Sequence, residues 1–153
     1  MDFPVNGYTI QRGSTLDRAL LSKFMGITYE ELFPGNPLTH LGHTVEQYFS
    51  SDTPLWWVFD ASQTAIGCLW VGIAIDQSSG VRHAHIFLLY VHPEHRRRGI
   101  ATAMMQCATA WAQARGDQQI GLQVFANNQP AVQLYQSLGY KIEAYSMLKQ
   151  LEA

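Results

Sequence analysis

Hydrophobic residues recur at helical spacing along the first third of the chain. A short strand over residues 8–12 precedes Ser14 and Thr15, either of which is a suitable helix N-cap. A helix is predicted next, ending before Pro34-Gly35-Asn36-Pro37, and its apolar stripe comprises Leu16, Leu20, Leu21, Phe24 and Met25. A second, shorter helix is predicted over residues 44–49.

The middle of the chain has the pattern of β-strands. Two apolar runs, residues 55–60 and 66–75, are joined by a polar turn, which predicts an antiparallel hairpin. Gly67 and Gly72 are candidates for bulges in it. The mostly apolar run 84–92 predicts a central strand that is buried on both faces.

Helices and strands alternate over the rest of the chain. Residues 99–114 are rich in helix formers, and one face of this helix carries Ile100, Met104, Cys107, Ala108 and Trp111. Residues 120–125, 130–138 and 141–148 predict a strand, a helix and a last strand. These elements predict an α/β fold, with helices on both faces of a mixed, largely antiparallel sheet, in a single domain over residues 1–153.

Composition and charge narrow the classes of function. The chain has 153 residues, of which 47% are hydrophobic and 14% charged, enough for one domain with a buried core. A net charge of -2 argues against binding nucleic acid over the whole surface, because such binding neutralises phosphates. No apolar run approaches the roughly 20 residues that span a bilayer, and no signal peptide is evident, so we expect a cytosolic protein without membrane contact.

The thiol and imidazole side chains lack the spacing of a metal site. Cys68 and Cys107 each lie in an apolar stretch, which predicts buried, reduced thiols. The histidines between residues 83 and 95 have no His-x-x-x-His spacing and no neighbouring cysteine. We therefore expect no metal.

The segment Arg96-Arg97-Arg98-Gly99-Ile100-Ala101 lies between the predicted buried strand and the long helix. Amides in the first turn of a helix have no intrahelical acceptor, and the positive end of the helix dipole favours an anion there. Gly99 lets the backbone approach that anion closely. The segment therefore predicts a phosphate-binding turn, with a solvated basic loop as the alternative. Walker and dinucleotide-binding loops are excluded by the missing Gly-Lys-Ser/Thr and the missing third glycine.

The pattern Arg/Gln-x-x-Gly-x-Gly/Ala between a strand and a helix resembles the acyl-CoA pyrophosphate loop of the GNAT acetyltransferase superfamily. Arg96, Gly99 and Ala101 stand at its fixed positions. The resemblance implies acetyl-CoA as co-substrate. It also implies that backbone amides line the pyrophosphate, with the Thr102 hydroxyl as an extra donor, and these amides belong to Arg97, Arg98, Gly99, Ile100, Ala101 and Thr102.

Residues 128–140 resemble the same superfamily's signature Asn-x-x-Ala-x-x-Leu-Tyr-x-x-x-Gly-Phe/Tyr. Asn128 is a suitable cap for the helix that Pro130 begins, and the resemblance also places Asn128 near the pantetheine arm. The resemblance assigns Tyr135 to the cofactor site as the general acid that protonates the departing thiolate. A packing aromatic is the alternative.

In this superfamily the strand before the loop splays from its neighbour and pairs with the pantetheine. The resemblance places the Leu89 N–H near the thioester carbonyl as an oxyanion donor, with Tyr90 and Val91 along the pantetheine. Where some members have a catalytic glutamate, this chain has His85, whose ordinary pKa of about 6.5 suits proton removal from an ammonium group. A hydrogen-bonded structural histidine is the alternative. His83 shares the face of His85 by strand alternation and is the spare candidate.

The acceptor pocket of this superfamily is usually shaped by the segment between the first two strands, here residues 15–54. It mixes carboxylates and aromatic residues, which either hold an ammonium group or form an ordinary core. The resemblance implies acetyl transfer to a primary amine of a small molecule or peptide, by direct attack in a ternary complex. A non-catalytic acyl-CoA-binding sensor is the alternative. The acceptor's identity and a homodimeric assembly stay open.

Overall fold

The computed structural model describes residues 2–152. The chain separates into two compact units, one ending at Gln123 and the other beginning at Val124. The first unit contains a five-stranded sheet in the order β1-β2-β3-β4-β5, and the second contains one helix. The mixed, largely antiparallel α/β architecture predicted from the sequence is therefore confirmed.

The sheet follows the order of the chain. Its strands are β1 (Thr9–Arg12), β2 (Leu55–Phe59), β3 (Ala65–Ile75), β4 (Arg82–Val91) and β5 (Ile120–Leu122). Neighbouring strands from β1 to β4 are antiparallel, whereas β4 and β5 are parallel. The predicted hairpin of β2 and β3 is confirmed, and the predicted buried strand is β4, inside the sheet. The predicted strand 120–125 is shorter than expected, since pairing with β4 stops at Leu122.

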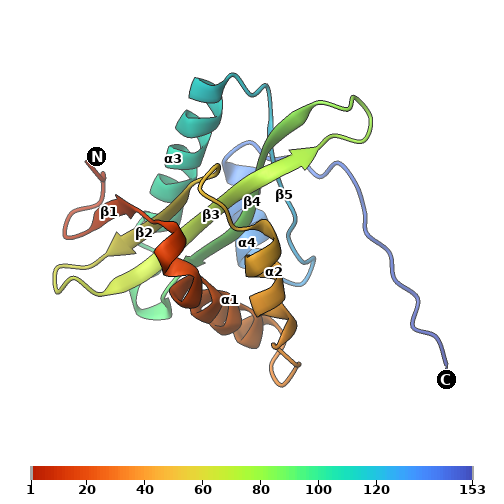
Figure 1. Ribbon diagram of the computed structural model, residues 1–153, viewed down its shortest axis with the longest axis horizontal. Helices are drawn as coiled ribbons and strands as arrows, with labels where there is room; N and C mark the ends of the chain where they lie inside the picture. The colour runs from red at the N-terminus through yellow and green to blue at the C-terminus, as the bar shows by residue number, and fades with distance from the viewer. Residues whose placement is uncertain (1, 153) are drawn as a thin grey trace. The chain divides into compact units, whose positions relative to one another are not determined.

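Two helices cover one face of the sheet (Figure 1). Ser14 caps the 3-10 turn Thr15–Asp17 in a capping box with Asp17, and α1 (Arg18–Leu32) and α2 (His40–Tyr48) follow. Residues of both helices pack against β2, β3 and β4 in one cluster. Leu16 does not belong to the stripe that was predicted for it, because it lies in the 3-10 turn with 92% of its surface exposed.

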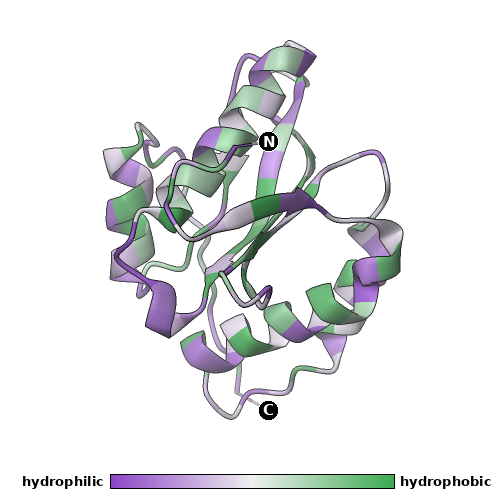
Figure 2. Ribbon diagram, turned by 90° about the vertical axis from the view of Figure 1, so that its left-hand side faces the viewer, coloured by the Kyte–Doolittle hydropathy of each residue, from purple (hydrophilic) through white to green (hydrophobic). Residues whose placement is uncertain are grey.

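The opposite face of the sheet is covered by α3 (Ile100–Arg115), and Figure 2 shows hydrophobic residues on the strands between the helices. Ile100, Met104 and Ala108 are buried, as predicted. Cys107 lies at the edge of the buried face and is only half-buried, while Cys68 is buried as expected, and within the described residues neither cysteine forms a disulfide.

The pairing of the sheet is irregular at two places. The shift between Val58 and Phe59 lies beside Gly67, which confirms an irregularity there. The second shift, between Trp70 and Val71, makes Phe87 the extra residue on β4. Gly72 is therefore not a bulge residue as predicted, but its missing side chain leaves the space that the Phe87 ring occupies.

The second unit contains α4 (Gln129–Ser137), which Gly139 follows with a φ of 97°. The last strand predicted over residues 141–148 is wrong, because that segment has no regular secondary structure. Its side chains are exposed, including Tyr145 at 84% and Leu148 at 89%. Polar and apolar alternation is not sufficient for a strand without a hydrogen-bonded neighbour. Within residues 2–152, no helix has both the length and the apolar character to cross a membrane.

Candidate functional site

The loop between β4 and α3 has the backbone geometry of an anion site. After the short 3-10 turn Pro93–His95, Arg97 and Gly99 both adopt left-handed conformations, with φ of 63° and 83°. The first intrahelical bond of α3 runs from the Ala103 N–H to the Gly99 carbonyl at 3.0 Å. The amides of the preceding first turn therefore lack intrahelical acceptors, and the helix dipole adds positive potential there. This arrangement suits a phosphate group.

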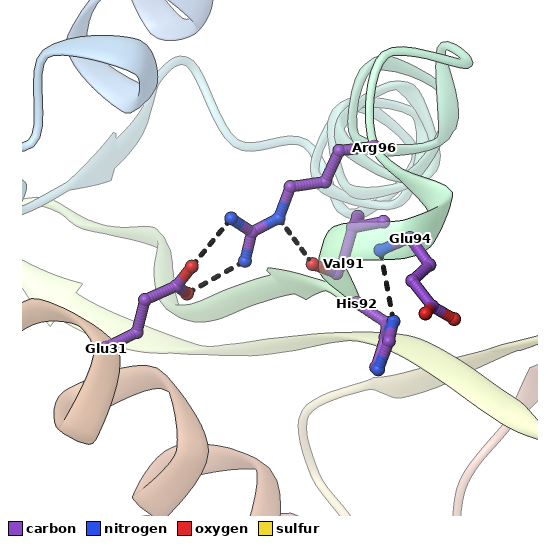
Figure 3. A network of polar contacts seen from close by, with 5 residues as sticks. All are labelled: Glu31, Val91, His92, Glu94 and Arg96. Carbon is purple, nitrogen blue, oxygen red and sulfur yellow. Dashed lines mark hydrogen bonds and ion pairs between the residues drawn. The ribbon is translucent and has the colours of Figure 1, made fainter.

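The arginine side chains of the loop have different environments. Arg96 forms a bidentate ion pair with Glu31 of α1, at 2.7 and 2.8 Å, and its Nε donates to the Val91 carbonyl at 2.8 Å (Figure 3). Arg98 donates to the Tyr8 hydroxyl at 2.9 Å. Arg97 is exposed. Hydrogen bonding to Arg96 lowers the pKa of the Glu31 carboxyl, so this pair is charged at neutral pH. The positive charge expected from all the arginines is therefore partly neutralised.

Among the described residues, no strand pairs with the outer edge of β4 beyond its pairing with β5, and this segment is called the open edge. β5 pairs only with residues 84–86, whereas β4 continues to Val91. The His92 N–H donates to the Ile66 carbonyl of the segment beginning β3, at 2.7 Å. Because backbone groups alternate in direction along an antiparallel pair, those of Leu89 and Val91 point away from β3. Leu89 thus presents both backbone groups at this edge, whereas Val91 presents its N–H, because its carbonyl accepts from Arg96 Nε.

The backbone groups of Tyr90 point in the opposite direction from those of Leu89 and Val91. By the same alternation its backbone groups face β3, and its ring is buried on the side of α1. That ring packs edge to face on Phe24, with 5.4 Å between the centroids. A backbone contact of Tyr90 with a ligand at the open edge therefore has no support in this geometry.

His85 lies on the face of the sheet that α1 and α2 cover. Its ring centroid is 6.5 Å from that of His83, so the shared face expected from alternation is confirmed. His85 is half-buried, and burial, followed by the nearby His83, lowers its pKa below the ordinary 6.5. His83 is buried, and its Nδ1 lies 2.9 Å from the Ala84 carbonyl oxygen. His85 is therefore the more accessible of the two imidazoles.

Aromatic side chains extend from His85 toward the end of α2. The Phe87 ring packs edge to face on His85 at 5.4 Å and lies 5.6 Å from the ring of Tyr48. Tyr48 remains 50% exposed. Phe87 was not among the predicted site residues, although strand alternation from His85 places it on the same face, and the bulge also brings it onto the face of Leu88.

The aromatic residues of the segment 15–54 divide between the core and the surface. Phe24 and Phe49 are buried in the cluster under α1 and α2, whereas Tyr29 and Phe33 are partly buried and Tyr48 is exposed. A groove of about 360 Å³ lies between the end of α1 and the beginning of α2. It is lined by Tyr29, Phe33, Asn36, Pro37, Leu38 and His40.

In the second unit, Tyr135 lies on α4 and is partly buried. Burial, with a contribution from Tyr140, raises the pKa of Tyr135 to about 12, so its phenol is protonated at neutral pH. Asn128 is the N-cap residue of α4, but its side chain makes no capping hydrogen bond. The capping role predicted for that side chain is therefore wrong, and its predicted contact with the pantetheine stays a prediction. Among residues 2–152, no group of three or more His, Cys, Asp or Glu side chains is placed to hold a metal ion.

Comparison with a family model and with curated relatives identifies an acetyltransferase family. The model of the acetyltransferase (GNAT) family matches residues 23–140. Human N-acetyltransferase 8 is 27% identical over 103 residues, which are 67% of this chain and 45% of that protein. The chain thus spans about half the length of this curated relative.

Solved structures share the fold. A putative acetyl transferase from Pyrococcus furiosus has a TM-score of 0.71 at 28% identity, covering 94% of this chain and 99% of that one. An aminoglycoside N-acetyltransferase in complex with CoA has a TM-score of 0.70 at 17% identity, covering 95% of each chain. Because the family model matches residues 23–140, which is more than half of the chain, the chain belongs to the acetyltransferase (GNAT) family.

Proposed function

We propose that this protein transfers an acetyl group from acetyl-CoA to a primary amine of a small molecule or peptide, by direct attack in a ternary complex. The observation that carries the proposal is the combination of a backbone anion site at the start of α3 with the open edge of β4 beside it. The first suits the pyrophosphate of CoA. The second suits the amide groups of its pantetheine arm. The cytosolic location expected from the sequence stays a prediction.

The chain's own residues supply the groups that aminolysis of a thioester requires. His85 takes a proton from the acceptor's ammonium group, directly or through water, and the neutral amine attacks the thioester carbon. The Leu89 N–H donates to the oxyanion that forms. As the carbon–sulfur bond breaks, Tyr135 donates a proton to the departing thiolate, so that CoA leaves as the thiol. The second proton of the attacking nitrogen passes, directly or through water, to the Tyr135 phenolate, which leaves a neutral amide and restores the phenol.

A thiol-release assay tests the reaction. With acetyl-CoA and a panel of small amines, amino-sugars and peptides, at least one acceptor is expected to release CoA thiol at a rate proportional to enzyme concentration. The acetylated amine is expected in equal amount by mass spectrometry. Tight CoA binding without turnover on any acceptor would instead favour a non-catalytic acyl-CoA sensor.

Replacing Gly99 by valine is expected to weaken CoA binding about tenfold, because a left-handed backbone costs a non-glycine residue roughly 1–2 kcal/mol. At its φ of 83° a β-branched residue displaces the amides of the loop. Isothermal titration calorimetry with CoA measures the effect. Gly116, the C-cap of α3 with a φ of 92°, is a matched control, since Gly116→Val imposes the same strain away from the loop. A larger loss of affinity in Arg97→Gln than in Gly99→Val would contradict the ranking of amides over side chains.

A further inference from the structure

The side chain of Arg96 points toward the end of β4 and toward α1, away from the loop that it begins. Its Nε donates to the Val91 carbonyl, and its two terminal nitrogens donate to the two carboxylate oxygens of Glu31 (Figure 3). The guanidinium also lies 5.8 Å from the centroid of the Tyr90 ring. Each guanidinium nitrogen thus has an acceptor within the chain. A side chain held in this way is not extended toward an anion in the loop.

These contacts join three parts of the proposed cofactor site. Val91 is the last residue of β4 and presents its N–H at the open edge. Arg96 begins the phosphate-binding loop, and Glu31 lies in the last turn of α1. By binding the Glu31 carboxylate and the Val91 carbonyl, the Arg96 side chain therefore holds the loop against both α1 and β4. Two parallel hydrogen bonds between a guanidinium and a carboxylate fix the orientation of the two groups in addition to strengthening their attraction.

We propose that Arg96 is a positioning residue. Through Val91 and Glu31 it holds the loop and the open edge of β4 in the geometry that binds CoA, and its guanidinium does not contact the pyrophosphate. This inference rests on the proposed function and reassigns a side chain that the sequence motif places in the cofactor site. The pair is partly exposed, with side-chain exposures of 41% for Arg96 and 43% for Glu31, so water screens part of its strength.

Neutralising either residue of the ion pair is expected to weaken CoA binding to a similar extent. Glu31→Gln and Arg96→Gln are each expected to raise the Kd for CoA about three- to fivefold, in keeping with a partly exposed pair. The double variant is expected to bind no more weakly than Arg96→Gln alone, because both changes remove one shared contact. At saturating acetyl-CoA, kcat and its pH profile are expected to match the wild type. Unchanged CoA affinity in Glu31→Gln overturns the proposal.

Arg96→Lys separates positioning from direct phosphate binding. Lysine keeps the positive charge, but a single ammonium group cannot bind both carboxylate oxygens and the Val91 carbonyl in the fork geometry of a guanidinium. We therefore expect Arg96→Lys to bind CoA as weakly as Arg96→Gln. CoA affinity close to wild type in Arg96→Lys, or tighter binding in Glu31→Gln, would mean that the guanidinium acts as a phosphate ligand.

Matched controls remove charges elsewhere in the same unit. Arg82→Gln and Asp52→Asn each neutralise an exposed side chain, and both are expected to keep wild-type affinity for CoA. Circular dichroism confirms that each variant is folded before titration. Absence of CoA binding by the wild type would reject the proposed function, whereas wild-type binding that is insensitive to Glu31→Gln rejects only the role of Arg96.

Discussion

Replacing Tyr135 by phenylalanine is expected to lower kcat by about 10²- to 10⁴-fold while the Kd for CoA stays nearly unchanged. The phenol has a pKa of about 12 and is therefore protonated throughout the neutral range, as a general acid must be. Phenylalanine keeps the ring and its packing and removes only the hydroxyl group whose proton the thiolate would take. Steady-state thiol release and calorimetric titration with CoA measure the two quantities separately.

Tyr140 provides the control for this substitution. Its ring lies 5.9 Å from that of Tyr135, and its buried hydroxyl makes no hydrogen bond within the described residues. Removing an unpaired buried hydroxyl costs little, so Tyr140→Phe is expected to keep both turnover and stability. If Tyr135→Phe also keeps wild-type turnover, Tyr135 has only a packing role and another group or water protonates the thiolate.

The strand–loop–helix arrangement around Gly99 was predictable because its signals are local. A buried strand, a glycine and a long run of helix formers adjoin one another in the sequence, and the structure has β4, the left-handed Gly99 and α3 in that order. The partner of Arg96 was not predictable in this way. Glu31 is separated from it by 65 positions, so the ion pair exists only because the fold brings α1 to the end of β4.

Errors in the sequence-based prediction occur where pairing between distant segments decides the outcome. Phe87 shares a face with the adjacent Leu88 only because the pairing of β3 and β4 shifts by one residue there, and the register of two strands cannot be read from either strand alone. Residues 141–148 alternate as a strand would, yet they have no strand partner within the described chain. Leu16 has the right spacing for the stripe of α1 but lies in a 3-10 turn, where that spacing no longer applies.

Replacing His85 by glutamine is expected to lower kcat/KM by about 10²-fold at neutral pH and to remove the acidic limb of its pH profile. In the wild type, burial lowers the pKa of His85 below 6.5, so the imidazole is neutral at pH 7 and able to accept a proton. As the pH falls through that pKa, His85 becomes protonated and kcat/KM decreases. The midpoint of this limb is therefore expected below pH 6.5. An acidic limb that persists unchanged in His85→Gln would exclude His85 as the base.

Replacing His83 tests whether this residue only lowers the pKa of His85 or is itself the catalytic base. Positive charge on His83 disfavours protonation of His85, so His83→Gln is expected to keep the acidic limb and to move its midpoint upward, toward 6.5. If His83 were itself the base, the same substitution would abolish the limb, and His85→Gln would leave it in place. The two variants thus give opposite results for the two assignments. Because neither variant alters the loop or the open edge of β4, CoA affinity measured on both reports whether the change is confined to proton transfer.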